Sequence, residues 1–404
     1  MKRSFAAAVV FSVYTFVILA AGFWMGRTGW PLVELGVPVA VAPPEAEEQF
    51  APFWEVWNLV NARYVNQPLD PDTLTEGAIN GMLNTLDDPH TRYLPPAQEE
   101  AARENMEGEF SGIGVLVEMV DDQITIVSPF EGSPAEAAGL NPGDVLLEAD
   151  GVSLEDASLS DAADLIRGPA GTTVHLVVSR NGEIFEVDVE RDVIRIPSVR
   201  GEMLEANIAY VRLNRFANLT AEEMEETLAG LMAQNPDGLI LDVRNNPGGG
   251  LQPAITVADQ FLPEGVILVE RFGGGREELY ESTDEGMAEN IPMVVLMNEG
   301  SASAAEVLAG ALRDRERATL IGTTTFGKGT VQTWHPLSNG GGVRITVARW
   351  LTPNGVWLHE DGLEPDIRVA PLDAEEAQAH PLAPSDDEAA EDAQLRAAIE
   401  FLKE

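Results

Sequence analysis

Lysine is the residue type whose sparse use in this chain points most directly to chemistry. The 404 residues include 22 arginines but only three lysines, Lys2, Lys328 and Lys403. The outer two lie at the chain ends, whereas Lys328 stands in the interior segment TTTFGKGTVQ. Arginine keeps its proton at any pH that a protein meets, but a buried lysine can lose its proton near neutrality and act as a base. Two interpretations of Lys328 stay open at this point, a general base and a chance occurrence.

Two serines lie at a predicted strand-to-helix junction that could activate one of them. The apolar run PMVVLMN (292–298) leads through a turn of small residues, which includes Ser301 and Ser303, into a predicted helix. Unpaired N–H groups at a helix N-terminus favour developing negative charge, although a serine before a helix is most often only a cap. The two serines therefore compete for the roles of cap and nucleophile. A neutral Lys328 amine could take the hydroxyl proton of either, a known variant of the serine triad.

A glutamine and a glycine run could complete such a site. Gln332 lies four residues after Lys328, and in a helix or a strand this spacing puts both side chains on one face. Gln332 could orient the amine without adding charge, or it could be a surface residue. The run RNNPGGG (244–250) follows a predicted strand, so it either makes a turn or brings backbone N–H groups to a ligand as oxyanion donors. The phosphate-loop pattern is absent, which argues against nucleotide binding.

Composition excludes several other classes of chemistry. The chain has no cysteine, and its five histidines form no HExxH or similarly spaced pair, so we expect no metal centre and no cofactor. His335 and His359 are the only histidines in the expected core, and they leave a histidine-dependent hydrolase as a rival interpretation. The net charge of −42 argues against nucleic acid and anionic membrane surfaces as partners.

The N-terminus predicts a location outside the cytoplasm. Lys2 and Arg3 precede an uncharged, largely apolar run (4–26) that is long enough to span a bilayer, and the basic flank predicts a cytoplasmic N-terminus. We therefore expect a membrane anchor at 1–27 and a Pro-rich spacer at 28–48. The alternative is a signal peptide cut near PVAVA (38–42), which would leave a secreted or periplasmic protein.

The rest of the chain divides by its hydrophobic periodicity. Residues 49–106 follow a helical period, and 107–192 read as short strands with Gly-rich turns and two helices. Residues 193–372 alternate apolar, β-rich runs with amphipathic helices, which predicts an α/β core. Residues 373–404 form an acidic tail with a short terminal helix.

Eight segments occur in the order expected of one known family. They are GAINGMLNTLDDPHTRYL, GEFSGIGV, SPAEAAGLNPGDVLLEADG, IRGPAGTTV, LDVRNNPGGG, NEGSASAAE, TTTFGKGTVQ and GLEPDI. Through them the chain resembles the carboxyl-terminal processing peptidases, also called tail-specific proteases. The resemblance implies a multidomain α/β protein: an N-terminal helical arm, an inserted PDZ domain (a β-sandwich with two helices) and a serine–lysine peptidase core.

The resemblance also implies a function and partners. It is that of an extracytoplasmic serine endopeptidase that captures unstructured protein C-termini on its PDZ domain. A non-catalytic PDZ scaffold that binds such tails without cutting them is the alternative. Members often dimerise through terminal helical regions, and the aromatic residues near Trp54 and Trp57 are consistent with a homodimer or with packing on their own core.

Site residues carry over by motif. The resemblance makes Ser303 the nucleophile, Lys328 the base and Gln332 the supporting residue. It pairs the N–H of Ala304 with a glycine of the GGG run, best matched by Gly249, as the oxyanion hole.

The PDZ segment has counterparts of its own. The loop GIGV, which is Gly112, Ile113, Gly114 and Val115, would hold a substrate's C-terminal carboxylate on backbone N–H groups while the tail adds as a β-strand. Arg167 matches an arginine that in some relatives couples the PDZ domain to the active site, and it could equally be a surface helix terminator.

Overall fold

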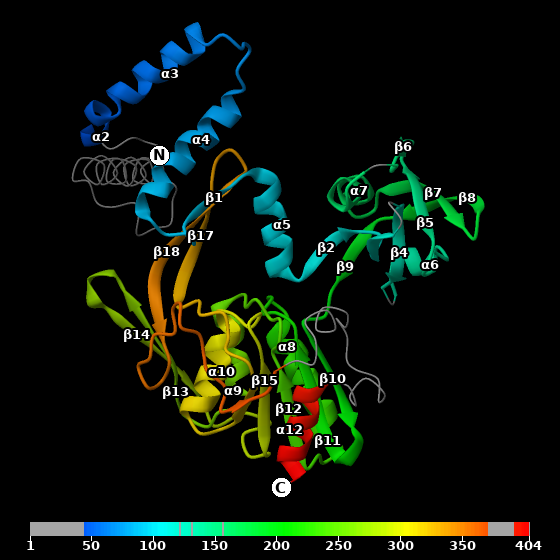
Figure 1. Ribbon diagram of the computed structural model, residues 1–404, viewed down its shortest axis with the longest axis vertical. Coiled ribbons are helices and arrows are strands. Elements are labelled where there is room, and N and C mark those ends of the chain that lie inside the picture. The colour runs from blue at the N-terminus through cyan, green and yellow to red at the C-terminus, as the bar shows by residue number, and fades with distance from the viewer. Residues whose placement is uncertain (1–43, 121–122, 131, 156, 371–391, 404) are drawn as a thin grey trace, which may run out of the picture. The chain divides into compact units, whose positions relative to one another are not determined.

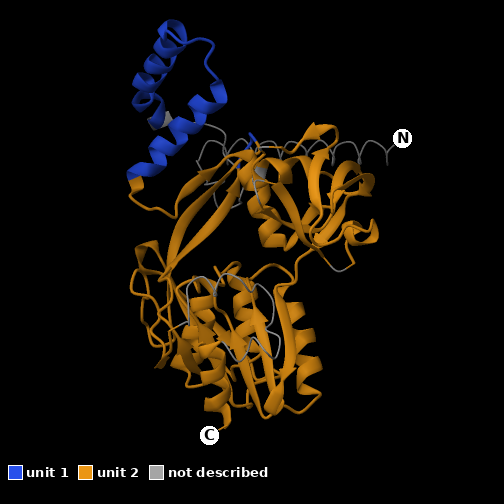
Figure 2. Cartoon of the chain, turned by 45° about the vertical axis from the view of Figure 1, so that its right-hand side comes forward, with its two compact units in different colours: residues 1–85, 337–339 blue, residues 86–336, 340–404 orange. Residues whose placement is uncertain are grey.

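The computed structural model describes residues 44–120, 123–130, 132–155, 157–370 and 392–403 (Figure 1). The expected anchor at 1–27 and the acidic stretch 373–391 lie outside these residues. Within the described ranges, no helix combines the length and the apolar character needed to cross a bilayer. The chain divides into two compact units, residues 1–85 with 337–339 and residues 86–336 with 340–404 (Figure 2).

The described part of the first unit is helical, as its periodicity predicts. It contains α2 (Pro44–Gln49), α3 (Ala51–Arg63) and α4 (Pro71–Leu83). Helix α4 begins with Asp70, whose carboxylate accepts hydrogen bonds from the N–H groups of Asp72 and Thr73, a standard N-cap. Helix α2 begins inside the segment that we expected to be a Pro-rich spacer up to residue 48.

The first part of the second unit contains a six-stranded antiparallel sheet with its own core. Its strands are β3 (Val115–Val120), β4 (Gln123–Pro129), β5 (Val145–Ala149), β6 (Val152–Ser153), β7 (Thr173–Arg180) and β8 (Glu183–Glu190). Their order is β3-β4-β5-β7-β8, with β6 paired to β5, so β3 is an edge strand. Two helices, α6 (Pro134–Ala137) and α7 (Leu159–Ile166), accompany the sheet, and the strand pair β2 (Glu109–Gly112) and β9 (Asp192–Arg195) connects it to its neighbours.

A second six-stranded sheet forms the central layer of the α/β core. Its order is β10-β11-β12-β15-β16-β19, and all its pairs except β10–β11 are parallel. The strands are β10 (Val199–Leu204), β11 (Ile208–Leu213), β12 (Gly238–Asp242), β15 (Met293–Met297), β16 (Thr319–Gly322) and β19 (Ile367–Arg368). Three helices, α8 (Thr220–Met232), α9 (Leu251–Asp259) and α10 (Ala304–Asp314), supply side chains to one buried layer.

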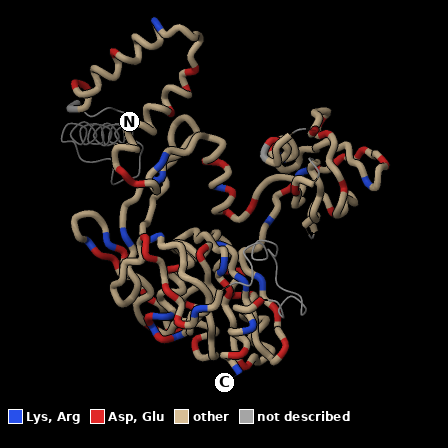
Figure 3. The backbone as a smooth tube through the Cα atoms, viewed as in Figure 1, with Lys and Arg blue, Asp and Glu red and all other residues tan. Residues whose placement is uncertain are grey.

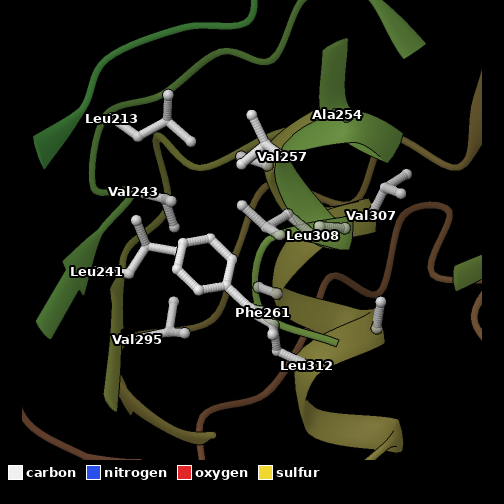
Figure 4. Close-up of a cluster of buried hydrophobic side chains, with 14 of the residues drawn as sticks. Leu213, Leu241, Val243, Ala254, Val257, Phe261, Val295, Val307, Leu308 and Leu312 are labelled. Carbon is white, nitrogen blue, oxygen red and sulfur yellow. The ribbon is translucent and has the colours of Figure 1, made fainter. Parts of the chain in front are cut away.

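Both faces of this sheet are buried at its central strands β11, β12, β15 and β16, which explains why these strands are apolar at nearly every position. On one face, Leu241, Val243 and Val295 pack against Phe261 and the helix residues Leu308 and Leu312 (Figure 4). On the other face, a separate cluster joins β11, β12, β15 and β16 to the terminal helix α12 (Ala393–Lys403). The predicted terminal helix is therefore part of the core, because its residues Leu395 and Ala398 are fully buried.

An antiparallel sheet completes the second unit. Its order is β1-β18-β13-β14, with β17 paired to the β18 strand. The strands are β1 (Arg92–Leu94), β13 (Gly265–Phe272), β14 (Glu277–Ser282), β17 (Thr330–Pro336) and β18 (Gly342–Leu351). Strand β1 lies inside 49–106, which we expected to be a helical region without strands, and it precedes α5 (Pro96–Glu107). Three residues pairing with a distant strand leave no periodicity in the local sequence, which is why β1 was missed.

Candidate active site

Three loops that follow neighbouring parallel strands build the candidate site. Strands β12, β15 and β16 are adjacent, so their carboxyl ends lie at one edge of the sheet, where α/β proteins commonly bind ligands. The loop after β12 carries the glycine run, the loop after β15 carries Ser303, and the loop after β16 carries Lys328. Two backbone hydrogen bonds join the loops, from Ala302 N to Asn246 O (2.9 Å) and from Phe326 N to Ser301 O (3.0 Å).

Ser303 occupies a strained turn at the start of α10. Its backbone has φ +55° and ψ −114°, a conformation that L residues rarely adopt. Such strain costs about 1–3 kcal/mol and persists where the surrounding structure enforces it. A serine in a sharp strand-to-helix turn presents its hydroxyl at the sheet edge, the same principle that nucleophile elbows use. The Ser303 side chain is half-buried and lines the site cavity.

Ser301 has a different environment from Ser303. The Ser301 hydroxyl is buried, donates to Val243 O (2.8 Å) and accepts a hydrogen bond from Asn298 N (3.0 Å). These bonds tie the start of the turn to the loop after β12. Ser301 is therefore held by two buried hydrogen bonds, whereas Ser303 is the N-cap residue of α10 and also has access to the cavity.

Glu306 is a site residue that the sequence reasoning missed. Its fully buried carboxylate accepts four hydrogen bonds: Oε2 from Ser303 N (2.7 Å) and Lys328 N (2.9 Å), and Oε1 from Gly327 N (2.7 Å) and Thr325 Oγ1 (2.5 Å). One side chain therefore fixes the serine turn and the lysine loop to each other. The available signal was the spacing Ser303-x-x-Glu306, a capping-box pattern at a helix start.

Lys328 is held by its backbone while its amine stays unpaired. Its N–H donates to Glu306 and its carbonyl accepts from Trp350 Nε1 (2.8 Å). No group within the described residues forms a hydrogen bond or ion pair with Lys328 Nζ, and none joins it to the Ser303 hydroxyl. Burial lowers the pKa of Lys328 below its ordinary value, and the charges of Arg344 and Arg92 lower it further, against the opposing carboxylates of Glu306 and Asp88.

Gln332 lines the same cavity but is bonded elsewhere. Its amide donates to the hydroxyls of Thr330 (2.9 Å) and Thr346 (3.2 Å). Lys328 precedes β17, and a register shift lies between Val331 and Gln332, so simple strand alternation does not relate the two side chains as we expected. The structure brings Gln332 to the site without a bond to the amine.

The glycine run presents one free N–H beside the serine turn. Gly248 N donates to Asn246 Oδ1 (2.9 Å) and Gly250 N donates to Phe216 O (2.8 Å), whereas Gly249 N has no acceptor within the described chain. Ala304 N likewise has none among the described residues. A Cβ added at Gly248 would lie 2.9 Å from Ala304 N, so the two segments are in direct contact. Gly249 and Ala304 thus offer two unpaired donors to the same cavity.

The GIGV loop also exposes backbone donors. Gly114 O and Ile113 O accept from Phe130 N and Ala135 N (2.9 Å each), while the N–H groups of Ile113 and Gly114 donate to no described group. A Cβ at Gly114 would lie 2.5 Å from the Ser133 Cβ, and its φ is +76°, so this position requires glycine. Gly112 ends β2 and Val115 opens the edge strand β3.

Arg167 does not reach the cavity. It follows α7, forms an ion pair with Glu104 of α5 (3.6 Å) and lies over the Phe110 ring (5.1 Å). It therefore bridges the PDZ-like segment to the preceding helix. Neither His335 nor His359 lines the cavity: His335 contacts Thr333, and His359 stacks on Trp357. The histidine-dependent rival gains no support from this geometry.

A single large cavity contains these groups. Its volume is about 1810 Å³, and Ser303, Ala304, Lys328, Gln332 and Gly249 all line it. Its wall also includes Leu116 of the edge strand β3 and neighbouring residues of β4, so the strand that is open for pairing borders the same space. No group of three or more candidate metal ligands occurs among the described residues. The arrangement offers a hydroxyl, an amine and two N–H donors, which suits acyl transfer.

Three protein-family models match successive parts of the chain. The family model of peptidase family S41 matches residues 207–369, that of the PDZ domain matches 125–180, and that of the activating protease CtpB N-terminal domain matches 39–97. The carboxy-terminal processing protease CtpA of Bacillus subtilis is 40% identical over 306 residues, which cover 75% of this chain and 65% of that protein.

Other relatives are matched over more of their length. The carboxy-terminal-processing protease of Bartonella bacilliformis is 38% identical over 80% of this chain and 75% of its own. The carboxyl-terminal-processing protease of Synechocystis is 40% identical over 77% of this chain and 74% of its own length. A solved photosystem II D1 C-terminal processing protease is 32% identical over 79% of this chain and 92% of its own, with a TM-score of 0.48. A Bacteroides fragilis structure described as an S41 protease is 17% identical over 86% of this chain and 96% of its own, with a TM-score of 0.56. This similarity supports the fold alone.

Proposed function

The chain belongs to the carboxyl-terminal processing proteases of peptidase family S41, and from this membership we propose that it is an endopeptidase whose nucleophile is Ser303 and whose base is Lys328. Membership confirms the resemblance carried by the sequence motifs. It also confirms the expected fold class, a helical N-terminal region, a PDZ domain and an α/β serine peptidase core.

The proposed reaction is acyl transfer to serine. Neutral Lys328 Nζ takes the proton of Ser303 Oγ as Oγ attacks the scissile carbonyl carbon. The N–H groups of Gly249 and Ala304 stabilise the oxyanion of the tetrahedral intermediate. The intermediate collapses, the C–N bond breaks, and Lys328 returns its proton to the leaving amine. Water then attacks the acyl ester with Lys328 again as base, which releases the acid product and restores Ser303.

Electrostatics supports Lys328 as this base. An amine must be neutral to accept a proton, and burial together with Arg344 and Arg92 lowers the pKa of Lys328 toward that state. Glu306 holds Lys328 through the backbone N–H, so its carboxylate fixes the loop without an ion pair to Nζ. In this role Gln332 is a supporting residue that must leave its threonine partners to reach the amine.

The PDZ domain is proposed to capture the substrate tail. The N–H groups of Ile113 and Gly114 would bind the terminal carboxylate, and the tail would pair with the edge strand β3. Because β3 borders the cavity, a tail bound there would run toward Ser303. Arg167 would act on this step through its contacts with Glu104 and Phe110.

The location is proposed from the N-terminal sequence. The basic pair and the apolar run 4–26 support a single-pass anchor with the peptidase outside the cytoplasm, or a cleaved signal that leaves a secreted or periplasmic enzyme. Protein substrates with unstructured C-termini are the proposed partners, and a homodimer through the helical first unit is a further proposal.

The observation that carries the function is the meeting of Ser303, Lys328 and the two unpaired N–H groups in one cavity. The test is to incubate the purified full-length protein, wild type and Ser303→Ala, with an unfolded substrate that bears a C-terminal tail, and to map the products by mass. We expect internal cleavage by the wild type alone. Tail binding without cleavage by either protein would instead establish the PDZ scaffold.

A further inference from the structure

The charged residues that line the active-site cavity, within the described part of the chain, are all basic. The chain has 67 acidic and 25 basic residues, and acidic positions recur along the traced backbone (Figure 3). Yet among the described residues no aspartate or glutamate lines this cavity, whose charged lining consists of arginines and Lys328. In a chain this acidic, a cavity lining without a carboxylate is unexpected by chance. A lining of positive charge alone favours the binding of a negatively charged ligand.

Two of these arginines face each other directly. Arg92 of β1 and Arg344 of β18 are cross-strand partners, so their side chains leave the sheet on the same face. Like charges in this position destabilise a strand pair. Within the described residues, the Arg92 side chain has no hydrogen bond or ion pair, and the Arg344 side chain only stacks on the Trp334 ring (4.1 Å). The carboxylate of Glu99 acts on the pKa of Arg344, but it accepts a hydrogen bond from Trp334 Nε1 and forms no ion pair with either guanidinium.

Three other arginines of the cavity are already occupied. Arg195 pairs with Glu109 (2.6 Å), Arg212 pairs with the buried Asp242 (2.7 Å), and Arg215 donates to Ile196 O (3.0 Å). A fourth, Arg200, also lines the cavity and has no side-chain hydrogen bond or ion pair among the described residues. The facing pair is distinguished from Arg200 by its cross-strand position and by the effect of both charges on the pKa of Lys328. The planar guanidinium fork suits bidentate binding of a carboxylate.

We propose that Arg92 and Arg344 form a subsite that binds a carboxylate of the peptide substrate beside Lys328, so that the enzyme prefers acidic substrate segments at this point. The inference rests on the proposed function. One bound carboxylate leaves a net positive charge on the pair, so Lys328 still faces a cation. The carboxylate has two sources, an acidic side chain near the scissile bond or the C-terminus of the tail.

The test uses matched peptides and full-length enzyme. Peptides of one neutral sequence carry a single glutamate, or glutamine as the control, at successive positions around the cleavage site, each with a free or an amidated C-terminus. Specificity constants are measured for the wild type, Arg92→Gln and Arg344→Gln, at a pH above the rising limb of each variant's activity. This choice of pH separates substrate binding from any change in the protonation of Lys328. Thermal unfolding checks that each variant is folded.

Arg349→Gln is the matched control variant. Arg349 lies on the same strand and also stacks on a tryptophan, Trp357 (4.2 Å), but it is outside the cavity lining. Its cross-strand partner Arg271 is neutralised by Glu277 (2.7 Å). We expect Arg349→Gln to keep the preference of the wild type.

We expect the wild type to cleave the best glutamate peptide roughly ten-fold faster than its glutamine match, as a charge-assisted hydrogen bond allows. Arg92→Gln and Arg344→Gln should lose most of this ratio. If these variants instead lose the advantage of a free over an amidated C-terminus, the bound group is the terminal carboxylate. Amidation also weakens PDZ capture, but equally in wild type and variant, so that effect cancels.

An unchanged ratio in both variants, or no acid preference in the wild type, overturns the inference while leaving the peptidase proposal intact. If the wild type cleaves none of the peptides, the peptidase proposal fails. The dissociation constants of the same peptides then test whether the arginine subsite exists. A glutamate preference in binding that Arg92→Gln and Arg344→Gln abolish would then support the subsite, and equal binding of both peptides would reject it.

Discussion

Replacing Glu306 with glutamine should uncouple the serine turn from the lysine loop. The substitution keeps the shape of the side chain but turns one acceptor oxygen into an NH₂ donor. If the amide nitrogen takes the Oε2 position, it faces the N–H groups of Ser303 and Lys328; if it takes the Oε1 position, it faces Gly327 N and the Thr325 hydroxyl. Either orientation leaves at least one buried N–H without an acceptor.

The structure sets the size of the effect. A buried donor without a partner costs about 1–3 kcal/mol, so the better orientation lowers the free energy of unfolding by about 1–3 kcal/mol and the other by about 2–6 kcal/mol. A catalytic group misplaced by even a small distance costs about 10²-fold in rate. The lost negative charge has a separate effect, because Glu306 raises the pKa of Lys328. Without that charge the pKa of Lys328 falls further, and the rising limb of activity moves to lower pH.

The assay is a pH profile of kcat/KM on one peptide, with denaturant unfolding in parallel. The control is Glu299→Gln in the same turn, since Glu299 is exposed and accepts one hydrogen bond, from Thr323 Oγ1 (2.8 Å). We expect Glu306→Gln to have a lower maximum and a rising limb at lower pH, and Glu299→Gln to match the wild type. A Glu306→Gln enzyme with full activity, or with a rising limb at higher pH, would refute the reasoning.

Four further outcomes are expected. Lys328→Arg should abolish cleavage, because arginine does not release its proton, and it should change the free energy of unfolding by less than about 1 kcal/mol. Any retained activity would exclude Lys328 as the general base. Ser301→Ala should cost about 1–3 kcal/mol in denaturant unfolding and keep cleavage, whereas Ser303→Ala should lose cleavage and stay folded; the reverse pattern would exchange the two roles. Gly249→Ala keeps the N–H but places a Cβ in steric clash with Phe216 O, so the loop must shift and kcat should fall on the order of 10²-fold; normal turnover would show that catalysis does not depend on the position of this N–H. In the wild type, activity should rise as pH rises through the lowered pKa of Lys328, and Arg344→Gln should move that limb to higher pH; a limb that stays in place would exclude Arg344 as a cause of the shift.

Periodicity predicted the elements of the core well, because two-sided burial makes parallel strands apolar throughout. The runs at β12 and β15 and the helix α10 appear where the sequence indicated them. Helix α9 was not predicted, since Pro253 and the β-branched run of Ile255, Thr256 and Val257 disfavour helix locally. Burial of Ile255 and Val257 against the sheet outweighs that propensity.

Site residues that belong to short local motifs could be predicted from the sequence, whereas contacts between residues far apart in the sequence could not. Ser303 and Lys328 follow from short motifs, but the choice between Ser301 and Ser303 depends on a backbone conformation and on a bond to Val243. The juxtaposition of Arg92 and Arg344 depends on the pairing of β1 with β18, and neither segment carries a local sequence signal for that pairing. Glu306 was visible in the capping-box spacing, and its contacts with the lysine loop were not.

Direct titration of Lys328 tests the central claim most closely. The chain has only three lysines, so full-length protein labelled with ¹³C and ¹⁵N at lysine gives three side-chain signals to follow by NMR as pH changes. We predict that one signal, absent from Lys328→Arg, titrates clearly below the ordinary lysine pKa of about 10.4. If all three signals titrate near that ordinary value, Lys328 is charged in the resting enzyme and the proposed base is wrong.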